Sequence, residues 1–169
     1  GGGAMVCLFA VWVACAGASV TIVDVDRRRL ALMDRDGLTL VDDTGVHSAR
    51  ITAVAARDAP PADLVMLFTK GMHSASAIAS IAHLAAGRPA ALTLQNGIGN
   101  AELLAQTFGA ERVLLGSAHL PADLEGPTRV VSYGRSKIEI GGLSSASAVL
   151  AGAVGKQLRL AGFDTEIAD

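Results

Sequence analysis

The chain has 169 residues, enough for one domain with a sizeable core. Hydrophobic residues make up 51% of it but aromatics only 4%, so Ala, Val, Leu and Ile must form the core, as in a buried parallel sheet covered by Ala-rich helices. The formal charge is -2 and the longest basic run is Arg27-Arg28-Arg29, which argues against a nucleic-acid partner.

The opening stretch, Gly1-Gly2-Gly3-Ala4-Met5-Val6, predicts a phosphate-binding turn that leads into a buried helix reaching Ala16. Glycine lets a backbone approach a pyrophosphate closely, and the amides at the start of the helix then point at the phosphate. Val6 stands where the full fingerprint has a third glycine. An ordinary core helix after a glycine-rich start is the simpler alternative.

Other interpretations of the same stretch are a membrane span or the core of a signal peptide, because residues 4–23 carry no charge. Gly17 and the β-branched run Val20-Thr21-Ile22-Val23 instead indicate a helix, a turn and a strand. No basic residue precedes the apolar run, as a signal peptide requires. We therefore expect no membrane association.

Two cysteines, Cys7 and Cys15, lie on this first helix, about 12 Å apart along its axis, which is too far for a disulfide. Both are predicted to be core thiols in a reducing compartment, which favours the cytoplasm. The four histidines are scattered singly, so no metal site is expected.

Residues 19–25 predict a strand, and Asp26 is a plausible N-cap for a helix over residues 27–35 that Gly37 closes. Asp24 lies 23 positions after Gly1, close to the spacing at which an acidic residue binds the adenosine ribose hydroxyls. Its carboxylate disfavours a 2′-phosphate and so favours NAD over NADP. The basic run that begins at Arg27 could nevertheless offer a phosphate partner, or be a solvated helix start.

Residues 38–53 alternate around the turn Asp42-Asp43-Thr44-Gly45 and predict a hairpin insertion. The nearly continuous apolar run over residues 63–70 is typical of a central parallel strand. Lys70 stands at its carboxyl end, where open α/β sheets bind ligands.

A helix is predicted over residues 74–86, closed by Gly87, and a strand over residues 90–94. The strand ends in Gln95-Asn96-Gly97-Ile98-Gly99-Asn100, which puts amides and glycines on the expected ligand edge. Asn96 or Asn100 could instead cap a helix that runs to Phe108.

The remaining elements are a strand over residues 112–116, a pair of strands within 130–142 around Tyr133-Gly134-Arg135, a helix over 146–160 capped by Gly162, and a strand over 163–167. The whole order predicts one NAD(P)-binding Rossmann-like domain over residues 1–169. Its fold class is α/β, doubly wound, with a mainly parallel sheet and a β-hairpin insertion.

The chain resembles the N-terminal domain of the 2-dehydropantoate 2-reductase, or ketopantoate reductase, family over its entire length. The resemblance rests on the opening glycine turn, the strand that ends in Lys70, the E-R-V-L-x-G segment of residues 111–116, Gly126-Pro127 and, most specifically, the L-Q-N-G-x-G-N segment of residues 94–100. It implies reduction of 2-dehydropantoate, a 2-keto acid, to pantoate with NADPH or NADH, on the route to pantothenate and coenzyme A.

The resemblance also implies roles for particular residues. Those expected to wrap the pyrophosphate are Gly1, Gly3, Ala4 and Met5. Lys70 and Asn96 are expected beside the nicotinamide ribose and the substrate, and Asn100 is expected to help hold the substrate. Reduction of a ketone builds negative charge on its oxygen, which an ammonium donor such as Lys70 can meet.

This sequence departs from the family pattern at Val6, at Asp24 and in the Gly116-Ser117-Ala118-His119 segment, which lacks a threonine. The family's principal catalytic lysine belongs to a C-terminal helical domain absent from this chain, and the glycine turn should follow a strand. We therefore expect a truncated sequence that alone binds nucleotide poorly and turns over no ketopantoate.

Several alternatives stay open. The chain could be a non-catalytic dinucleotide-binding module or redox sensor, or part of a related 2-keto or 3-hydroxy acid dehydrogenase. A homodimer is possible for the full-length protein.

Overall fold

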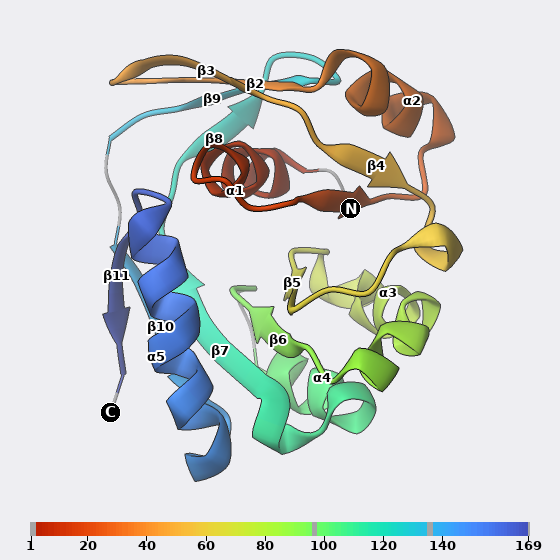
Figure 1. The fold of residues 1–169 in the computed structure, drawn as a ribbon, viewed down its shortest axis with the longest axis vertical. Helices are drawn as coiled ribbons and strands as arrows, with labels where there is room; N and C mark the ends of the chain where they lie inside the picture. Colours follow the sequence, from red (N-terminus) through yellow and green to blue (C-terminus); the bar gives the residue numbers. More distant parts are fainter. Residues whose placement is uncertain (1–2, 96–97, 135–136, 169) are drawn as a thin grey trace. The chain divides into compact units, whose positions relative to one another are not determined.

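The computed structural model describes residues 3–95, 98–134 and 137–168. Its elements form an α/β fold divided into two compact units (Figure 1). Unit 1 consists of Gly1–Ala59, Leu120–Ser136 and Leu160–Gly162, and unit 2 of Pro60–His119, Lys137–Arg159 and Phe163–Asp169. Each unit therefore draws on three separate stretches of the chain.

Unit 1 is built around helix α1 (Ala4–Cys15). One sheet is the parallel pair β1 (Thr21–Val23) and β4 (Thr52–Val54). The other has the order β3-β2-β9-β8, with bounds Gly45–Ala49, Leu38–Asp42, Arg129–Ser132 and Ala122–Leu124. Strands of both sheets contact α1, and its residues Cys7 to Val11 are all buried, as predicted for a helix that is apolar on every side.

Helix α2 (Arg27–Asp36) of unit 1 has the two predicted cap residues. The Asp26 carboxylate accepts a hydrogen bond from the Arg29 amide at 3.1 Å, and Gly37 closes the helix with a φ of 75°. The β2–β3 hairpin is also confirmed, but it ends at Ala49, because β4 pairs in parallel with β1 instead of extending the hairpin.

Unit 2 contains a five-stranded sheet with the order β11-β10-β7-β6-β5. Its strands are Asp164–Ile167, Lys137–Gly142, Val113–Ala118, Ala90–Thr93 and Leu64–Leu67. Strands β5, β6 and β7 are parallel and align Leu67, Thr93 and Leu115, so their carboxyl ends share one edge. Five of the eight strand pairings among the described residues are parallel, which agrees with the predicted mainly parallel α/β fold.

The helices of unit 2 are α3 (Ser74–Ser80), α4 (Asn100–Phe108) and α5 (Ser145–Leu160). Helix α4 packs on β6 and β7. Short 3-10 helices are η1 (Ala56–Asp58) in unit 1 and η2 (Gly71–His73), η3 (Ala82–Gly87) and η4 (Ala110–Arg112) in unit 2. The core of unit 2 includes the fully buried side chains Leu92, Leu104, Leu114, Ile138 and Ile140.

Both strands predicted within residues 130–142 are present, as β9 and β10, but the predicted pairing between them is wrong. Strand β9 pairs with β2 and β8, whereas β10 pairs with β7 and β11 (Figure 1). The segment around Tyr133 and Gly134 therefore connects strands of different units. Two alternating strands around a glycine turn look like a hairpin locally, but distant strands supply their partners here.

The predicted helix over residues 74–86 is also too long. It ends at Ser80 and continues as η3, and the residue that closes η3 in a left-handed conformation is Arg88, with a φ of 50°, not Gly87. Pro89 follows directly, and its ring disfavours a right-handed helical conformation at the residue before it.

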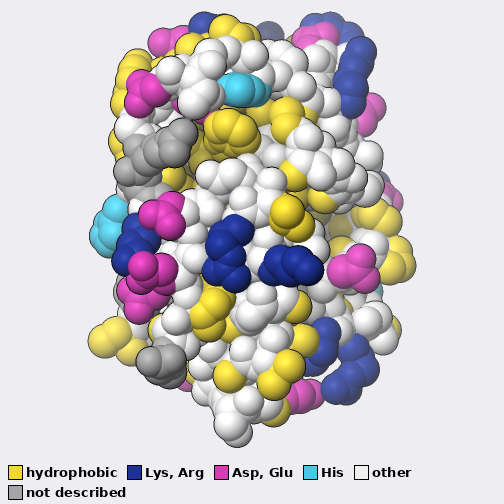
Figure 2. Space-filling view, turned by 60° about the vertical axis from the view of Figure 1, so that its left-hand side comes forward, with side chains coloured by type: hydrophobic (Ala, Val, Ile, Leu, Met, Phe, Trp, Pro, Cys, Tyr) yellow, Lys and Arg dark blue, Asp and Glu magenta, His cyan; other side chains and the backbone are white. Residues whose placement is uncertain are grey.

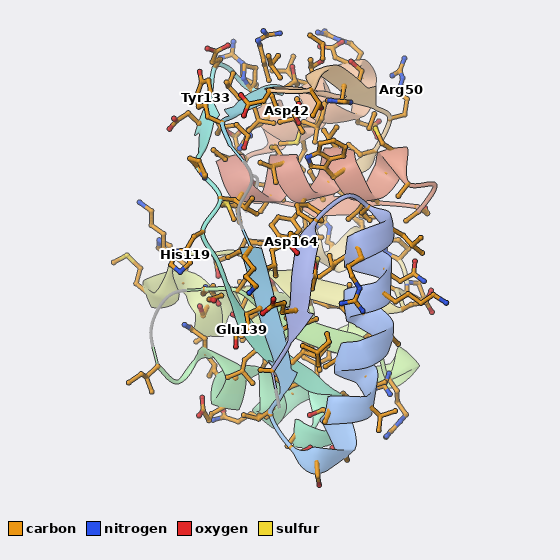
Figure 3. The ribbon with its side chains drawn as sticks, turned by 90° about the vertical axis from the view of Figure 1, so that its left-hand side faces the viewer. Asp42, Arg50, His119, Tyr133, Glu139 and Asp164 are labelled. Atoms are coloured by element: carbon orange, nitrogen blue, oxygen red, sulfur yellow. The ribbon has the colours of Figure 1, made fainter. Side chains whose placement is uncertain are left out.

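Acidic and basic side chains are interspersed on the face shown in Figure 2. Neighbouring strands β10 and β11 carry Glu139 and Asp164 (Figure 3), and Lys137 pairs with Glu166 across the same two strands at 2.5 Å. Within the described ranges, no helix combines the length and the apolar character needed to cross a membrane.

Candidate functional site

The start of α1 in unit 1 has no side-chain cap. Gly3 is the N-cap, no side chain caps the helix, and no acidic residue lies in its first turn. The partial positive charge at this end of α1 is thus not offset by a side chain of that turn. Gly1 lies outside the described residues.

Gly3 itself has φ −61°, a conformation that any residue adopts. Backbone freedom therefore does not account for the glycine. A Cβ placed there would meet no described atom within 4 Å, so the surface is open to a close-lying ligand. The half-buried Ala4 and Met5 follow as the first helical residues.

Asp24 follows β1 and shapes the turn into α2. Its Oδ1 accepts hydrogen bonds from the Val25 amide at 2.6 Å and the Asp26 amide at 3.0 Å. Arg27, the first residue of α2, is exposed, and Val25 is 95% exposed. Asp24 thus has a local structural role, and its predicted role at the ribose stays a prediction.

Arg29 joins three segments of unit 1, a role that the sequence did not predict. Its Nε donates a hydrogen bond to the Pro127 carbonyl at 2.9 Å, and its Nη2 lies 3.4 Å from the Cys7 sulfur. Burial raises the pKa of the Cys7 thiol, and the Arg29 charge partly offsets that rise. The partner Pro127 is 98 residues away in the chain, so no local pattern could reveal the contact.

A hollow of about 220 Å³ lies at this corner of unit 1. Its lining residues are Asp26, Arg28, Arg29, Leu32 and Pro127.

The two cysteines of α1 differ in burial. Both were predicted to be core thiols, but Cys7 is buried and Cys15 is exposed.

In unit 2, the carboxyl ends of β5 and β6 carry the second predicted group. Lys70 comes three residues after the end of β5, is exposed, and is the N-cap of η2. Asn96 lies outside the described residues. Asn100 is buried as the first residue of α4, whose N-cap is Gly99, so the alternative of Asn100 as the helix cap is wrong.

A hydrogen-bonded network joins these strand ends to α3 and α4. The Gln95 amide nitrogen donates to the Thr69 carbonyl and, at 3.0 Å, to the Ser74 hydroxyl. The Thr93 hydroxyl donates to Gln95 Oε1 at 3.1 Å, and the Ser74 hydroxyl donates to Asn100 Oδ1 at 3.3 Å. The network therefore links the residue before Lys70 to Asn100. Only the position of Gln95 at a strand end hinted at this role in the sequence.

The same strand ends border a second hollow of about 220 Å³. It is lined by Thr93, Gln95, Ile98, Gly99, Asn100, Ala101, Glu102, Leu115 and Gly116. Its lining mixes polar and apolar side chains. Across residues 3–95, 98–134 and 137–168, no group of three or more His, Cys, Asp and Glu side chains could hold a metal ion.

The predicted site residues thus fall into two groups. Gly3, Ala4, Met5, Asp24 and Arg27 belong to unit 1, and Lys70 and Asn100 belong to unit 2. That the two groups meet at one nicotinamide nucleotide stays a prediction.

This chain matches a protein-family model and several known proteins. The family model described as ketopantoate reductase PanE/ApbA matches residues 1–145. A 2-dehydropantoate 2-reductase from Halobacterium salinarum is 29% identical over 153 residues, which cover 88% of this chain and 50% of the relative. The chain therefore spans about half the length of this relative.

Solved structures agree. The ternary structure of a D-mandelate dehydrogenase with NADH and anilino(oxo)acetate has a TM-score of 0.92 and 25% identity, over 100% of this chain and 55% of the other. The 2-dehydropantoate 2-reductase from Geobacter metallireducens has a TM-score of 0.88 and 27% identity, over 99% and 56%. The Rossmann-like fold of this chain is thus shared with dehydrogenases.

Proposed function

Because the chain belongs to the ketopantoate reductase PanE/ApbA family, we propose that it is the cofactor-binding half of an NAD(P)H-dependent oxidoreductase that reduces 2-dehydropantoate to pantoate. The observation that best supports the proposal is the arrangement in unit 2, where Lys70 follows β5 and the network centred on Gln95 joins the ends of β5 and β6 to Asn100. Open α/β sheets bind their ligands at such carboxyl ends.

The residues at the start of α1 fit a dinucleotide. An uncapped helix start without acidic side chains can accept a pyrophosphate, with the amides near Gly3, Ala4 and Met5 as donors. We propose that residues 1–169 act as one NAD(P)-binding domain. Bound NAD(P)H would supply the hydride for the reduction.

Lys70 has the chemistry needed at the reacting carbonyl. Negative charge develops on the ketone oxygen during reduction, and the Lys70 ammonium can donate a hydrogen bond to it or to a ribose hydroxyl. Asn96 can donate and accept at the same time, which suits a position between ribose and substrate. Asn100 would hold the substrate from the first turn of α4.

The cofactor preference follows from unit 1. The Asp24 carboxylate lies at the end of β1, where it would accept hydrogen bonds from ribose hydroxyls and repel a 2′-phosphate. Arg27 and Arg28 are nearby and exposed, and would favour such a phosphate. We propose NAD as the preferred cofactor, with NADP as the alternative.

The test measures oxidation of NADH by the complete gene product in the presence of 2-dehydropantoate. We expect the cofactor to be oxidised. Lys70→Met should lower kcat/KM about 100-fold or more, as expected when a donor to a developing oxyanion is removed. The matched control Lys137→Met, at the exposed pair with Glu166, should leave kcat/KM unchanged.

A complete gene product that oxidises neither cofactor would contradict the proposal. Nucleotide binding without turnover of any 2-keto acid would favour the non-catalytic module or redox sensor.

A second candidate is reduction of a different 2-keto acid. The similarity to D-mandelate dehydrogenase, with a TM-score of 0.92, favours it. Rates with 2-dehydropantoate and with phenylglyoxylate, the keto acid that corresponds to mandelate, separate the two candidates: a higher kcat/KM for phenylglyoxylate would replace the pantoate assignment.

A further inference from the structure

We propose that Gln95 is a positioning residue that fixes the backbone of Lys70 relative to the end of β6. The proposal rests on the proposed function, in which Lys70 contacts the cofactor and the substrate. In this role Gln95 acts through the peptide group that precedes Lys70.

The geometry of the strand ends explains why such a bridge is needed. The parallel pairing of β5 with β6 ends at Leu67 and Thr93, and Lys70 lies three residues beyond it. The Gln95 side-chain amide donates to the Thr69 carbonyl beyond the end of this ladder. Because the Thr69 carbonyl and the Lys70 N–H belong to one planar peptide group, that hydrogen bond orients the backbone from which the Lys70 side chain departs.

The network around Gln95 leaves its amide one orientation. The nitrogen donates to the Thr69 carbonyl and the Ser74 hydroxyl, while Oε1 accepts from the Thr93 hydroxyl at 3.1 Å. Turning the amide over would set its oxygen against the Thr69 carbonyl. A glutamate or methionine of similar size cannot supply the two donors.

Burial makes the bridge hard to replace by water. Ser74 is 0% exposed and Thr93 is 3% exposed. Ser74 also passes the connection on, because its hydroxyl donates to Asn100 Oδ1 at 3.3 Å. Gln95 and Ser74 together therefore connect the peptide of Lys70 to the first turn of α4, the two places that the proposed reaction needs in register.

A spectroscopic test follows from the lysine content. Selective isotope labelling of lysine nitrogen in the complete gene product gives amide cross-peaks in an NMR spectrum that include those of Lys70, Lys137 and Lys156, the three lysines of this chain. Lys70→Arg assigns the first. The amide nitrogen shift responds to the hydrogen bond at the carbonyl of the same peptide group, so Gln95→Glu and Gln95→Met should move the Lys70 cross-peak and leave the Lys137 and Lys156 cross-peaks in place.

The matched control is Gln106→Glu, which makes the same chemical change on an exposed residue of α4. It should move none of the three cross-peaks. Unmoved Lys137 and Lys156 cross-peaks also show that a variant is folded.

In the complete gene product, both Gln95 variants should lower kcat about tenfold, the equivalent of one net hydrogen bond, and change KM for NADH less than about twofold. A Lys70 cross-peak that stays in place, or an unchanged kcat in an active enzyme, would overturn the proposal. If the unaltered gene product neither binds nucleotide nor reduces a 2-keto acid, the proposed function is wrong, and so is the role of Gln95 in that reaction. The lysine spectrum still shows whether Gln95 holds the peptide group before Lys70.

Discussion

Gly116 of β7 lies opposite Ile140 of β10 in the antiparallel pair, and Gly116→Ala should destabilise the protein. An alanine Cβ would overlap the Glu139 carbonyl oxygen and lie 2.9 Å from Cγ2 and 3.0 Å from Cα of Ile140. The Glu139 oxygen and the Ile140 Cα belong to the backbone of the paired strand β10, so they cannot rotate away as a flexible side chain could. Overpacking of this kind costs about 1–3 kcal/mol.

Gly152→Ala is the matched control in the same unit. Gly152 is exposed within α5, and a Cβ there would meet nothing within 4 Å. Alanine should therefore stabilise the protein by about 0.5–1 kcal/mol, because it lowers the conformational entropy of the unfolded chain without strain.

Thermal unfolding measures both effects. For a chain of this length, about 1 kcal/mol shifts Tm by roughly 2–4 °C, so Gly116→Ala should lower Tm by roughly 2–12 °C and Gly152→Ala should raise it slightly. Equal Tm values for Gly116→Ala and the unaltered chain would refute the close approach of β7 to β10. A fall in Tm for Gly152→Ala would refute the open space around that position.

Two further predictions concern unit 1. In the native chain a thiol reagent should modify Cys15 and leave the buried Cys7 unreacted until unfolding, as counted by mass spectrometry; equal native rates would contradict the burial of Cys7. Burial alone would raise the pKa of Asp42, but hydrogen bonds from the Thr44 hydroxyl and amide at 2.6 and 2.8 Å lower it overall. This carboxylate therefore stabilises the fold above pH 3.8, and the contribution is lost as pH falls through the lower folded pKa. The unaltered chain should then lose more stability below pH 3.8 than Asp42→Asn, measured by the fluorescence of the single tryptophan, Trp12; identical acid profiles would count against the shift.

Local signals in the sequence were sufficient for most elements. Asp26 and Gly37 bound α2 as predicted, because caps act within a few residues. The β2–β3 hairpin followed from its own turn. The family resemblance, based on short motifs in order, is confirmed by the family model over residues 1–145.

Contacts between segments far apart in the sequence could not be predicted from local patterns. The partners of β9 and β10 lie far along the chain, so a local hairpin pattern was misleading. Whether Cys15 is buried depends on which other segments pack against the last turn of α1. The apolar periodicity of a single helix does not show this.

The candidate site shows the same difference between local and long-range features. Lys70 could be proposed from its place after an apolar strand, whereas the role of Asn100 came from the family resemblance. The bridge that connects them could not, because Gln95 reaches Thr69 across 26 residues. The contact of Arg29 with Pro127 in unit 1, across 98 residues, could not be predicted either. Side-chain hydrogen bonds between distant segments depend on the folded register, which no local pattern encodes.

The most direct measurement of the central claim is a paired titration of the complete gene product with NADH and NADPH, in the unaltered form and as Lys70→Met, followed by addition of 2-dehydropantoate. We expect the unaltered protein to bind NADH more tightly than NADPH and to reduce the keto acid, and the Lys70→Met variant to lose the reduction. A protein that binds neither nucleotide, or a variant that reduces the keto acid at the full rate, would contradict the claim.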